Sequence, residues 1–430
     1  ALLTITACNN DLDQFPPNIA ESSSLTDYGE VLNAAYFYQH GSVTPMAVMG
    51  DFRADNALMI EPPFPEFDTY GPNLTDMEDQ FFGPFYTALY KSILSANNVI
   101  QNSDDAVEVG EAKFLRALSY FKLVRVFGDV PVNLEATPSV TDESILVRQR
   151  VDDVYDNVII PDINDAISAL DNSELSSGRA SEIAAQALLG KVYMQRGDYP
   201  NAETILAAVV NGASAAGVAL QTNYADIFGV DNDLNSEIIF ATQISSSITD
   251  EYGFSEFWSW YGGLDTKSLE PLDEDLIAAF DASPGDLRRA VNIDTSLLAS
   301  PKYPQTGGPD HDWIEIRLGD ILLLYAEALN ENNSSSIGEI LDVLDPIRER
   351  AGLSSLDEGT LNTQELVRQA IQDERRLELA FEGQRWFDLV RTGTVDEEMG
   401  QTIDSRYHLF PIPVSEILAS FDVITQNPGY

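Results

Sequence analysis

Acidic side chains are by far the commonest chemically active groups in this chain. Its 430 residues include 70 Asp and Glu against 24 Lys and Arg, three His and one Cys. With this many acidic residues, neighbouring carboxylates are expected by chance alone. No two of them can therefore be assigned as the acid and base of a glycosidase. One thiol cannot build a thiolate zinc site or an iron–sulfur cluster, and three histidines far apart in sequence disfavour a histidine-rich metal site. No hydrolase elbow, phosphate-binding loop or zinc-protease motif occurs. The residues therefore nominate no catalytic centre, metal site or cofactor.

Aromatic residues gather in one segment, 252–263, which is flanked by glycines. A site for a neutral sugar needs exposed rings that cover the apolar face of the sugar, and polar groups that bond its hydroxyls. The segment contains Tyr252, Trp258, Trp260 and Tyr261, including two of the four tryptophans. If it is extended, Trp258 and Trp260 point to one face, because side chains alternate along a strand. These rings are a candidate sugar platform, and the alternative is that they fill the core.

A second candidate is the polar run that follows the first expected helix. Asp51, Arg53, Asp55 and Asn56 lie within six residues. A guanidinium and carboxylates at this spacing could offer bidentate and single hydrogen bonds to sugar hydroxyls.

The net charge restricts the class of ligand. It is −46 at neutral pH, with histidine neutral. A surface this acidic repels phosphate backbones, so we expect no nucleic acid partner. A neutral glycan is easier to accept than a polyanion, unless a basic pocket lies inside and acts over less than a screening length.

Hydrophobic periodicity predicts a mostly helical protein. Amphipathic stripes with spacings of three and four run through 111–127, 314–330 and 364–382. Gly128 is expected to end the first of these helices. The spacing of Leu189-Gly190, Tyr193 and Ala202 matches a tetratricopeptide unit, in which small residues let paired helices approach closely. We infer a scaffold of about four degenerate helix pairs from segments 25–39, 82–101, 111–127, 152–170, 181–210 and 314–350.

Two stretches interrupt the helical pattern. Residues 41–80 and 215–312 are irregular, and 237–242 within the second stretch predicts a short buried strand. Irregular segments over a rigid scaffold commonly carry binding residues, so we expect the site there.

The start of the chain resembles the end of a bacterial lipoprotein signal. Residues 5–8 read Ile-Thr-Ala-Cys, a lipobox in which Cys8 would be lipidated after cleavage. A polar stretch with a Pro16-Pro17 pair follows and reads as a tether. We expect a protein anchored to a membrane through acyl chains, and the alternative is a cysteine buried in a short strand.

Three segments in this order resemble the SusD/RagB family of Bacteroidetes surface glycan-binding lipoproteins. They are Gly110–Leu118 leading to Phe127-Gly128-Asp129-Val130-Pro131, Glu374-Arg375-Arg376 followed by Phe381–Arg391, and Pro411-Ile412-Pro413 with the ending Gln426–Tyr430.

The resemblance implies a mostly α fold, with tetratricopeptide-like helix pairs forming a superhelix and an irregular, loop-rich second part. On this basis we expect five regions: a signal-peptide remnant at 1–7, a lipid-anchored tether at 8–20, a helical scaffold at 21–214, an irregular insertion with binding loops at 215–312, and the last helical pair with the C-terminal motif at 313–430.

The resemblance also implies a function. Family members sit on the outer face of the outer membrane, bind oligosaccharides and deliver them to a SusC-like TonB-dependent transporter without catalysis. Phe82 or Tyr86 occupies roughly the place where some relatives carry a stacking tryptophan. The charged residues of 374–385 suit an ion-pair network that locks the last helices together.

Three functions remain open from the sequence. The first is glycan capture, with laminarin-type neutral β-glucan as the expected ligand. The second is a transporter lid for another cargo, such as alginate or peptide, with little glycan affinity of its own. The third is a glycosidase hidden among the carboxylates, and it is the least favoured.

Overall fold

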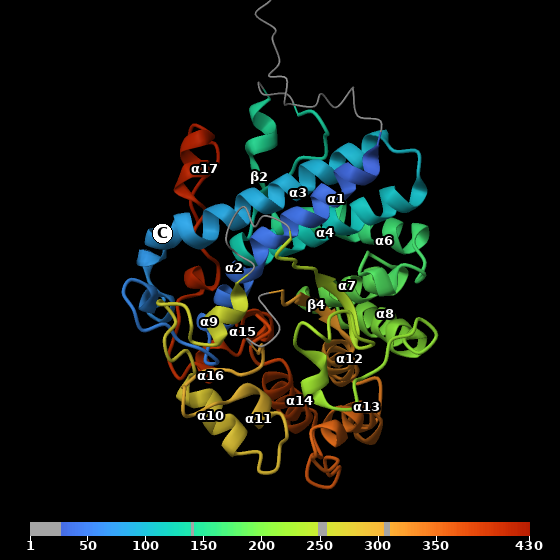
Figure 1. Cartoon of the computed structure of the whole chain (residues 1–430), viewed down its shortest axis with the longest axis vertical. Helices are drawn as coiled ribbons and strands as arrows, with labels where there is room; N and C mark the ends of the chain where they lie inside the picture. The colour runs from blue at the N-terminus through green and yellow to red at the C-terminus, as the bar shows by residue number, and fades with distance from the viewer. Residues whose placement is uncertain (1–26, 139–141, 248–255, 305–309) are drawn as a thin grey trace, which may run out of the picture.

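Successive helices pack against one another along the whole molecule. The structure is a computed structural model that describes residues 27–138, 142–247, 256–304 and 310–430. Contacts run in order from α1 to α3, α4, α6, α7 and α8, and then to α12 and α14 (Figure 1). This continuous stacking buries one apolar core and confirms the expected mostly helical, tetratricopeptide-like fold. Among the described residues, no helix combines the length and hydrophobicity required to cross a membrane.

The first half of the chain contains most of the helical scaffold. Short 3₁₀ and π turns η2 to η6, together with α2, connect α1 to α3 through residues 39–82, where the sequence predicts an irregular stretch. The elements of this half are α1 Tyr28–Tyr38, η2 Gln39–Ser42, α2 Val43–Ala47, η3 Val48–Phe52, η4 Phe64–Asp68, η5 Pro72–Met77, η6 Glu78–Phe82, α3 Gly83–Asn102, α4 Ala106–Phe127, β1 Val130–Pro131, β2 Arg148–Gln149, α5 Val151–Val154, η8 Tyr155–Ile159, α6 Ile160–Ala169, η9 Leu175–Ser177, α7 Glu182–Gln195 and α8 Tyr199–Gly212.

The second half adds short elements and the final helices. In Figure 1, α10 and α11 lie at the same lower end of the molecule as the C-terminal helices α13 and α14. Its elements are β3 Ile238–Thr242, α9 Phe257–Tyr261, α10 Glu274–Asp281, α11 Arg289–Asn292, β4 Trp313–Arg317, α12 Leu318–Asn332, α13 Ile337–Arg350, α14 Gln364–Glu378, α15 Arg385–Thr392, α16 Val395–Glu398 and α17 Val414–Ala419.

Side-chain caps and glycines set the ends of the long helices. Asp105 accepts hydrogen bonds from the first amides of α4, so that helix begins five residues before the predicted start at 111. It ends at Gly128, as expected, where φ is +73°. In the predicted repeat, a Cβ on Gly190 would lie 2.4 Å from Leu206, which shows how closely α7 and α8 approach each other.

The predicted strand pairs with a second strand, which lies where the helical spacing of 314–330 predicted a helix. β3 pairs antiparallel with β4, and Thr242 lies opposite Trp313. The expectation of a single helix over 314–330 is therefore wrong in its first turn, because α12 begins only at Leu318. The helix predicted over 364–382 ends at Glu378, since Phe381 and Gly383 take positive φ values and turn the chain.

Candidate functional site

The predicted polar run lies inside the protein. Asp51 is completely buried, and its carboxylate accepts hydrogen bonds from the Tyr261 hydroxyl at 2.7 Å, the Gly383 amide at 2.7 Å and the Asn56 amide at 3.0 Å. Burial raises the pKa of Asp51 to about 6, against the hydrogen bonds that lower it. Asp51 and Asn56, which the sequence nominates as sugar contacts, are instead buried, and they join the first irregular stretch to the C-terminal motif.

Arg53 and Asp55 have the same structural setting. The Arg53 guanidinium is fully buried and donates to the carbonyls of Phe67 at 2.6 Å and Tyr407 at 2.9 Å. Both Asp55 oxygens accept from Arg385, at 2.7 and 2.8 Å. A buried charge must be paired or hydrogen-bonded to be tolerated, and these partners fulfil that requirement. These two nominated sugar contacts are therefore also buried and bonded within the protein.

The aromatic segment forms a helical turn instead of an extended platform. Phe257, Trp260 and Tyr261 have the i, i+3, i+4 spacing that buries one face of a helix, and all three are buried in α9. Trp258 therefore does not share a face with Trp260. The Trp260 ring packs edge-on against Phe52, Phe64 and Phe81. Tyr252 lies outside the described residues, as does Cys8.

Phe82 and Trp258 differ in exposure. Phe82 is fully buried and packs against Phe67 and Phe410, so the expected stacking position is part of the core. Trp258 is only half-buried, its ring lies 6.0 Å from that of His311, and its Nε1 has no hydrogen-bond partner among the described residues. Of the described rings that the sequence nominates, Trp258 retains the most accessible surface.

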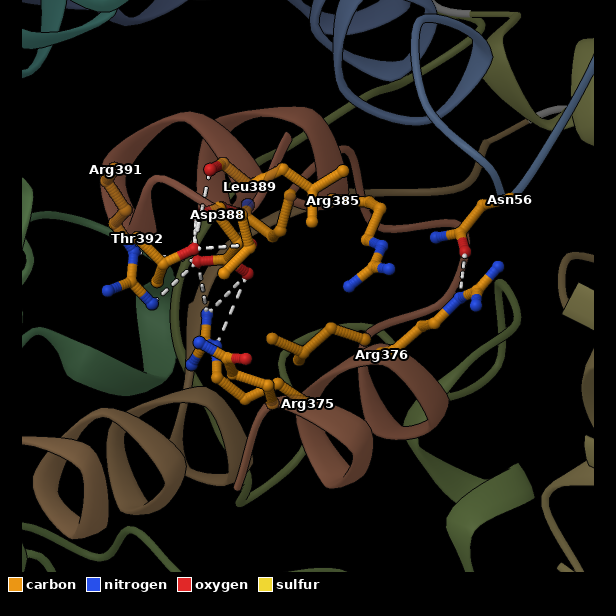
Figure 2. Close-up of a pocket in the computed structure, with 12 residues that line it drawn as sticks. Asn56, Arg375, Arg376, Arg385, Asp388, Leu389, Arg391 and Thr392 are labelled. Atoms are coloured by element: carbon orange, nitrogen blue, oxygen red, sulfur yellow. Dashed lines mark hydrogen bonds and ion pairs between the residues drawn. The ribbon is translucent and has the colours of Figure 1, made fainter. Parts of the chain in front are cut away.

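Arg375 of the predicted ion-pair run pairs with carboxylates that lie outside 374–385. Arg375 and Arg391 lie on either side of Asp388, with N–O distances of 3.0 and 2.8 Å, and line a cavity of about 20 Å³ (Figure 2). Arg375 also pairs with Asp320, and Arg391 with Glu327, both in α12. The network thus ties α14 and α15 to α12.

A second buried network joins Glu378 and Glu382 of the predicted run to partners that the sequence did not indicate, because those partners are far away in the chain. Arg317 of β4 lies among Glu237, Glu378 and Glu382, with N–O distances of 2.9, 2.7 and 2.7 Å. Arg350 joins from α13 at 2.5 Å from Glu237. These groups hold the β3–β4 pair against α13 and α14.

An open pocket between α1 and β3 has the composition that a neutral sugar requires. It has a volume of about 320 Å³, within the size range of ligand pockets. Half-buried rings of Tyr36 and Phe37 stand on one wall, and exposed polar groups surround them. This α1–β3 pocket is lined by Asn33, Tyr36, Phe37, Gln39, His40, Glu174, Ser177, Arg179, Phe240, Ala241, Thr242 and Gln243.

Arg179 is the cation of this pocket, and it is held in place. Its Nε donates to Glu111 at 2.7 Å, its Nη1 donates to Asn33 at 3.0 Å, and its guanidinium lies 4.9 Å from the centre of the Tyr36 ring. Burial raises the pKa of Glu111, against the effects of Tyr36 and Arg179. Within the described residues Nη2 of Arg179 has no partner, so it can donate to a ligand oxygen.

The pocket and Trp258 belong to the same end of the β3–β4 pair. Gln243 lines the pocket, and the amide of the next residue, Ile244, donates to Asp312 at 2.8 Å. Asp312 follows His311, whose ring contacts Trp258. The sequence signal that could have indicated this site is the adjacent ring pair Tyr36-Phe37 near the end of α1, but its partner Arg179 is more than 140 residues away.

Two family profiles match the chain. The one described as the SusD family matches residues 287–430, and the one described as starch-binding associating with outer membrane matches residues 9–194. The chain is 27% identical to SusD-like protein P2 of Formosa agariphila, over 100% of this chain and 98% of that protein. It is 24% identical to the starch-binding protein SusD of Bacteroides thetaiotaomicron, over 79% and 76% of the two chains.

Solved structures show the same fold. A laminarin-binding SusD-like protein superposes with a TM-score of 0.74 and 26% identity, over 94% of this chain and 99% of that one. A SusD superfamily protein of Parabacteroides distasonis gives a TM-score of 0.76 at 22% identity, over 94% and 98%. Since both profiles, the whole-length relatives and the superposed folds agree, the chain belongs to the SusD/RagB family.

Proposed function

We propose that this chain is a lipid-anchored protein on the outer face of the outer membrane, where it captures a neutral glycan and delivers it uncleaved to a SusC-like TonB-dependent transporter. The observation that carries the proposal is the similarity to a laminarin-binding SusD-like protein, which is 26% identical over 94% of this chain. A laminarin-type β-1,3-glucan is therefore the first ligand to test. Cys8 would carry the anchor.

The α1–β3 pocket supports a neutral ligand. Its rings can stack on the apolar face of a sugar, while Asn33, Gln243 and Arg179 can bond hydroxyls. Arg179 and the exposed Glu174 give the lining one charge of each sign. A polyanion such as alginate would find no excess of cations there, and it would be repelled by the chain's charge of −46.

Replacing Phe37 with alanine should weaken laminarin binding about tenfold or more, because a stacked aromatic ring contributes on the order of 1 kcal/mol beyond its buried area. Isothermal calorimetry of the purified chain with laminarin, mixed-linkage glucan, xylan and alginate measures this directly. Trp258→Ala tests the half-buried ring at the other side of the β3–β4 end.

Phe421→Ala is the matched control, since the Phe421 ring is 90% exposed and does not line the pocket. If only the Trp258 variant lost binding, the glycan site would be assigned to α9 instead of the α1–β3 pocket. Shortened products in the titrated laminarin would contradict binding without catalysis. If alginate bound and laminarin did not, the neutral-ligand proposal would fail.

The alternative is a lid that serves a transporter and binds little glycan alone. Absence of binding to every glycan, together with co-purification of a TonB-dependent transporter from membranes that contain the full chain, would favour it.

A further inference from the structure

Arg125 differs from the other cations in this protein. It projects from α4 between two aromatic rings, with its guanidinium carbon 4.4 Å from the centre of Phe121 and 4.8 Å from that of Phe387. Among the described residues it has no hydrogen bond and no carboxylate within 4.0 Å, and its buried Nε has no partner. A half-buried guanidinium without an anion is unfavourable, because burial removes the water that would otherwise solvate it.

The neighbouring cations are already neutralised by protein carboxylates. Each Lys or Arg around Arg125 forms an ion pair with a carboxylate. Arg125 therefore gives this group one surplus positive charge. The pairs are Lys122 with Glu315, Lys191 with Asp320, Arg375 with Asp320 and Asp388, and Arg391 with Glu327 and Asp388.

A small cavity lies beside the unpaired guanidinium. Arg125, Lys191, Arg375 and Arg391 all line it, and Asp388 is the single carboxylate in the lining. The free space is about 20 Å³, which accommodates one body close to the size of a water molecule. Gln195 also lines the cavity, and its side-chain amide has no hydrogen bond among the described residues. The cavity therefore combines a surplus positive charge with an available N–H donor.

We propose that this cavity binds one chloride ion, held by the Arg125 guanidinium and the Gln195 amide between α4, α7 and α15. The small free space favours a monatomic anion, and a lining with four cations and one carboxylate favours an anion over a metal ion. Because the three helices come from both halves of the chain, the ion would join the first helical scaffold to the C-terminal motif. The proposal is independent of which glycan the protein binds.

The test compares the melting temperature of the whole chain in sodium chloride and in sodium gluconate at equal ionic strength. Equal ionic strength cancels general screening of the acidic surface. We expect a saturable rise of a few °C in chloride, as for any ligand that binds only the folded state. Arg125→Met, which keeps an unbranched side chain between the rings, should remove that rise. Arg406→Met should retain it, because Arg406 forms an exposed pair with Asp404.

A second measurement does not depend on the stability of a variant. Crystals of the native chain grown in bromide should show an anomalous peak beside Arg125. The proposal is overturned if melting is identical in the two salts, if Arg125→Met keeps the chloride effect, or if bromide occupies other positions only.

Discussion

Glu378→Gln is expected to lower the free energy of unfolding by about 3–5 kcal/mol, the usual cost of removing one partner from a buried ion network. The Glu378 side chain is completely buried. Its carboxylate lies 2.7 Å from Arg317 and 3.0 Å from Arg288, and it also pairs with Arg350. A neutral amide would leave these guanidinium groups with one negative charge fewer, in a place that water does not reach. Urea unfolding of the variant and the native chain measures the difference.

The matched control is Glu365→Gln, which removes a carboxylate from an exposed pair with Arg368. Exposed pairs contribute between zero and about 1 kcal/mol, so this variant should unfold close to the native chain. If both variants lost the same stability, the buried network would not be the cause.

The pKa of the Glu378 carboxyl group determines part of the pH dependence of the native state's stability. Burial alone would raise the pKa of Glu378, but Arg350, Arg317 and Arg288 outweigh it and lower the pKa to about 2. A carboxylate whose pKa falls on folding stabilises the native state fully at any pH above its unfolded-state pKa. It loses that contribution as the pH falls to its folded-state pKa. Native stability should therefore decline between about pH 4.5 and 2, and the Glu378→Gln variant should show a shallower decline there.

Helices and their pairing could be predicted from the sequence because the necessary information is local. The stripe over 111–127, the close approach at Gly190 and the buried strand at 237–242 each depend on spacing within a few residues, and the structure contains all three. The family followed from three short motifs. The boundaries of the five expected regions stay predictions.

The position of the charged side chains could not be predicted in the same way. Asp55 resembles a surface residue in sequence because its neighbours are polar, yet it is buried against Arg385, 330 positions away. Trp258 and Trp260 have strand-like alternation, but five residues are too few to distinguish a strand from one helical turn. The α1–β3 pocket likewise depends on bringing Arg179 to Tyr36. In each case the deciding partner is distant in the chain.

The distribution of charge follows from these buried networks. Of the residues that the structure describes, ten Lys and Arg and eleven Asp and Glu are buried, so this interior is nearly neutral and contains almost none of the acidic surplus. Cations that might have balanced the surface are instead held in the core as partners of carboxylates. This arrangement keeps the exterior repulsive to anionic polymers, in agreement with the neutral ligand proposed for the pocket.

Gly50→Ala is the second substitution with a large expected effect, about 3 kcal/mol of lost stability, at the upper end for an overpacked site. A Cβ at Gly50 would lie 2.1 Å from the carbonyl oxygen of Gly383 and 2.3 Å from its carbonyl carbon. These are backbone atoms, and the Gly383 amide is fixed by its bond to Asp51, so the contact cannot be relieved by moving one side chain. Gly212→Ala is the control, because nothing lies within 4 Å of the added atom. Equal urea midpoints for the two variants would contradict the prediction.

Hydrogen exchange shows where the structure is weakened. In Gly50→Ala the amides near Gly383 should lose protection first, because that contact is where the first irregular stretch meets the C-terminal motif.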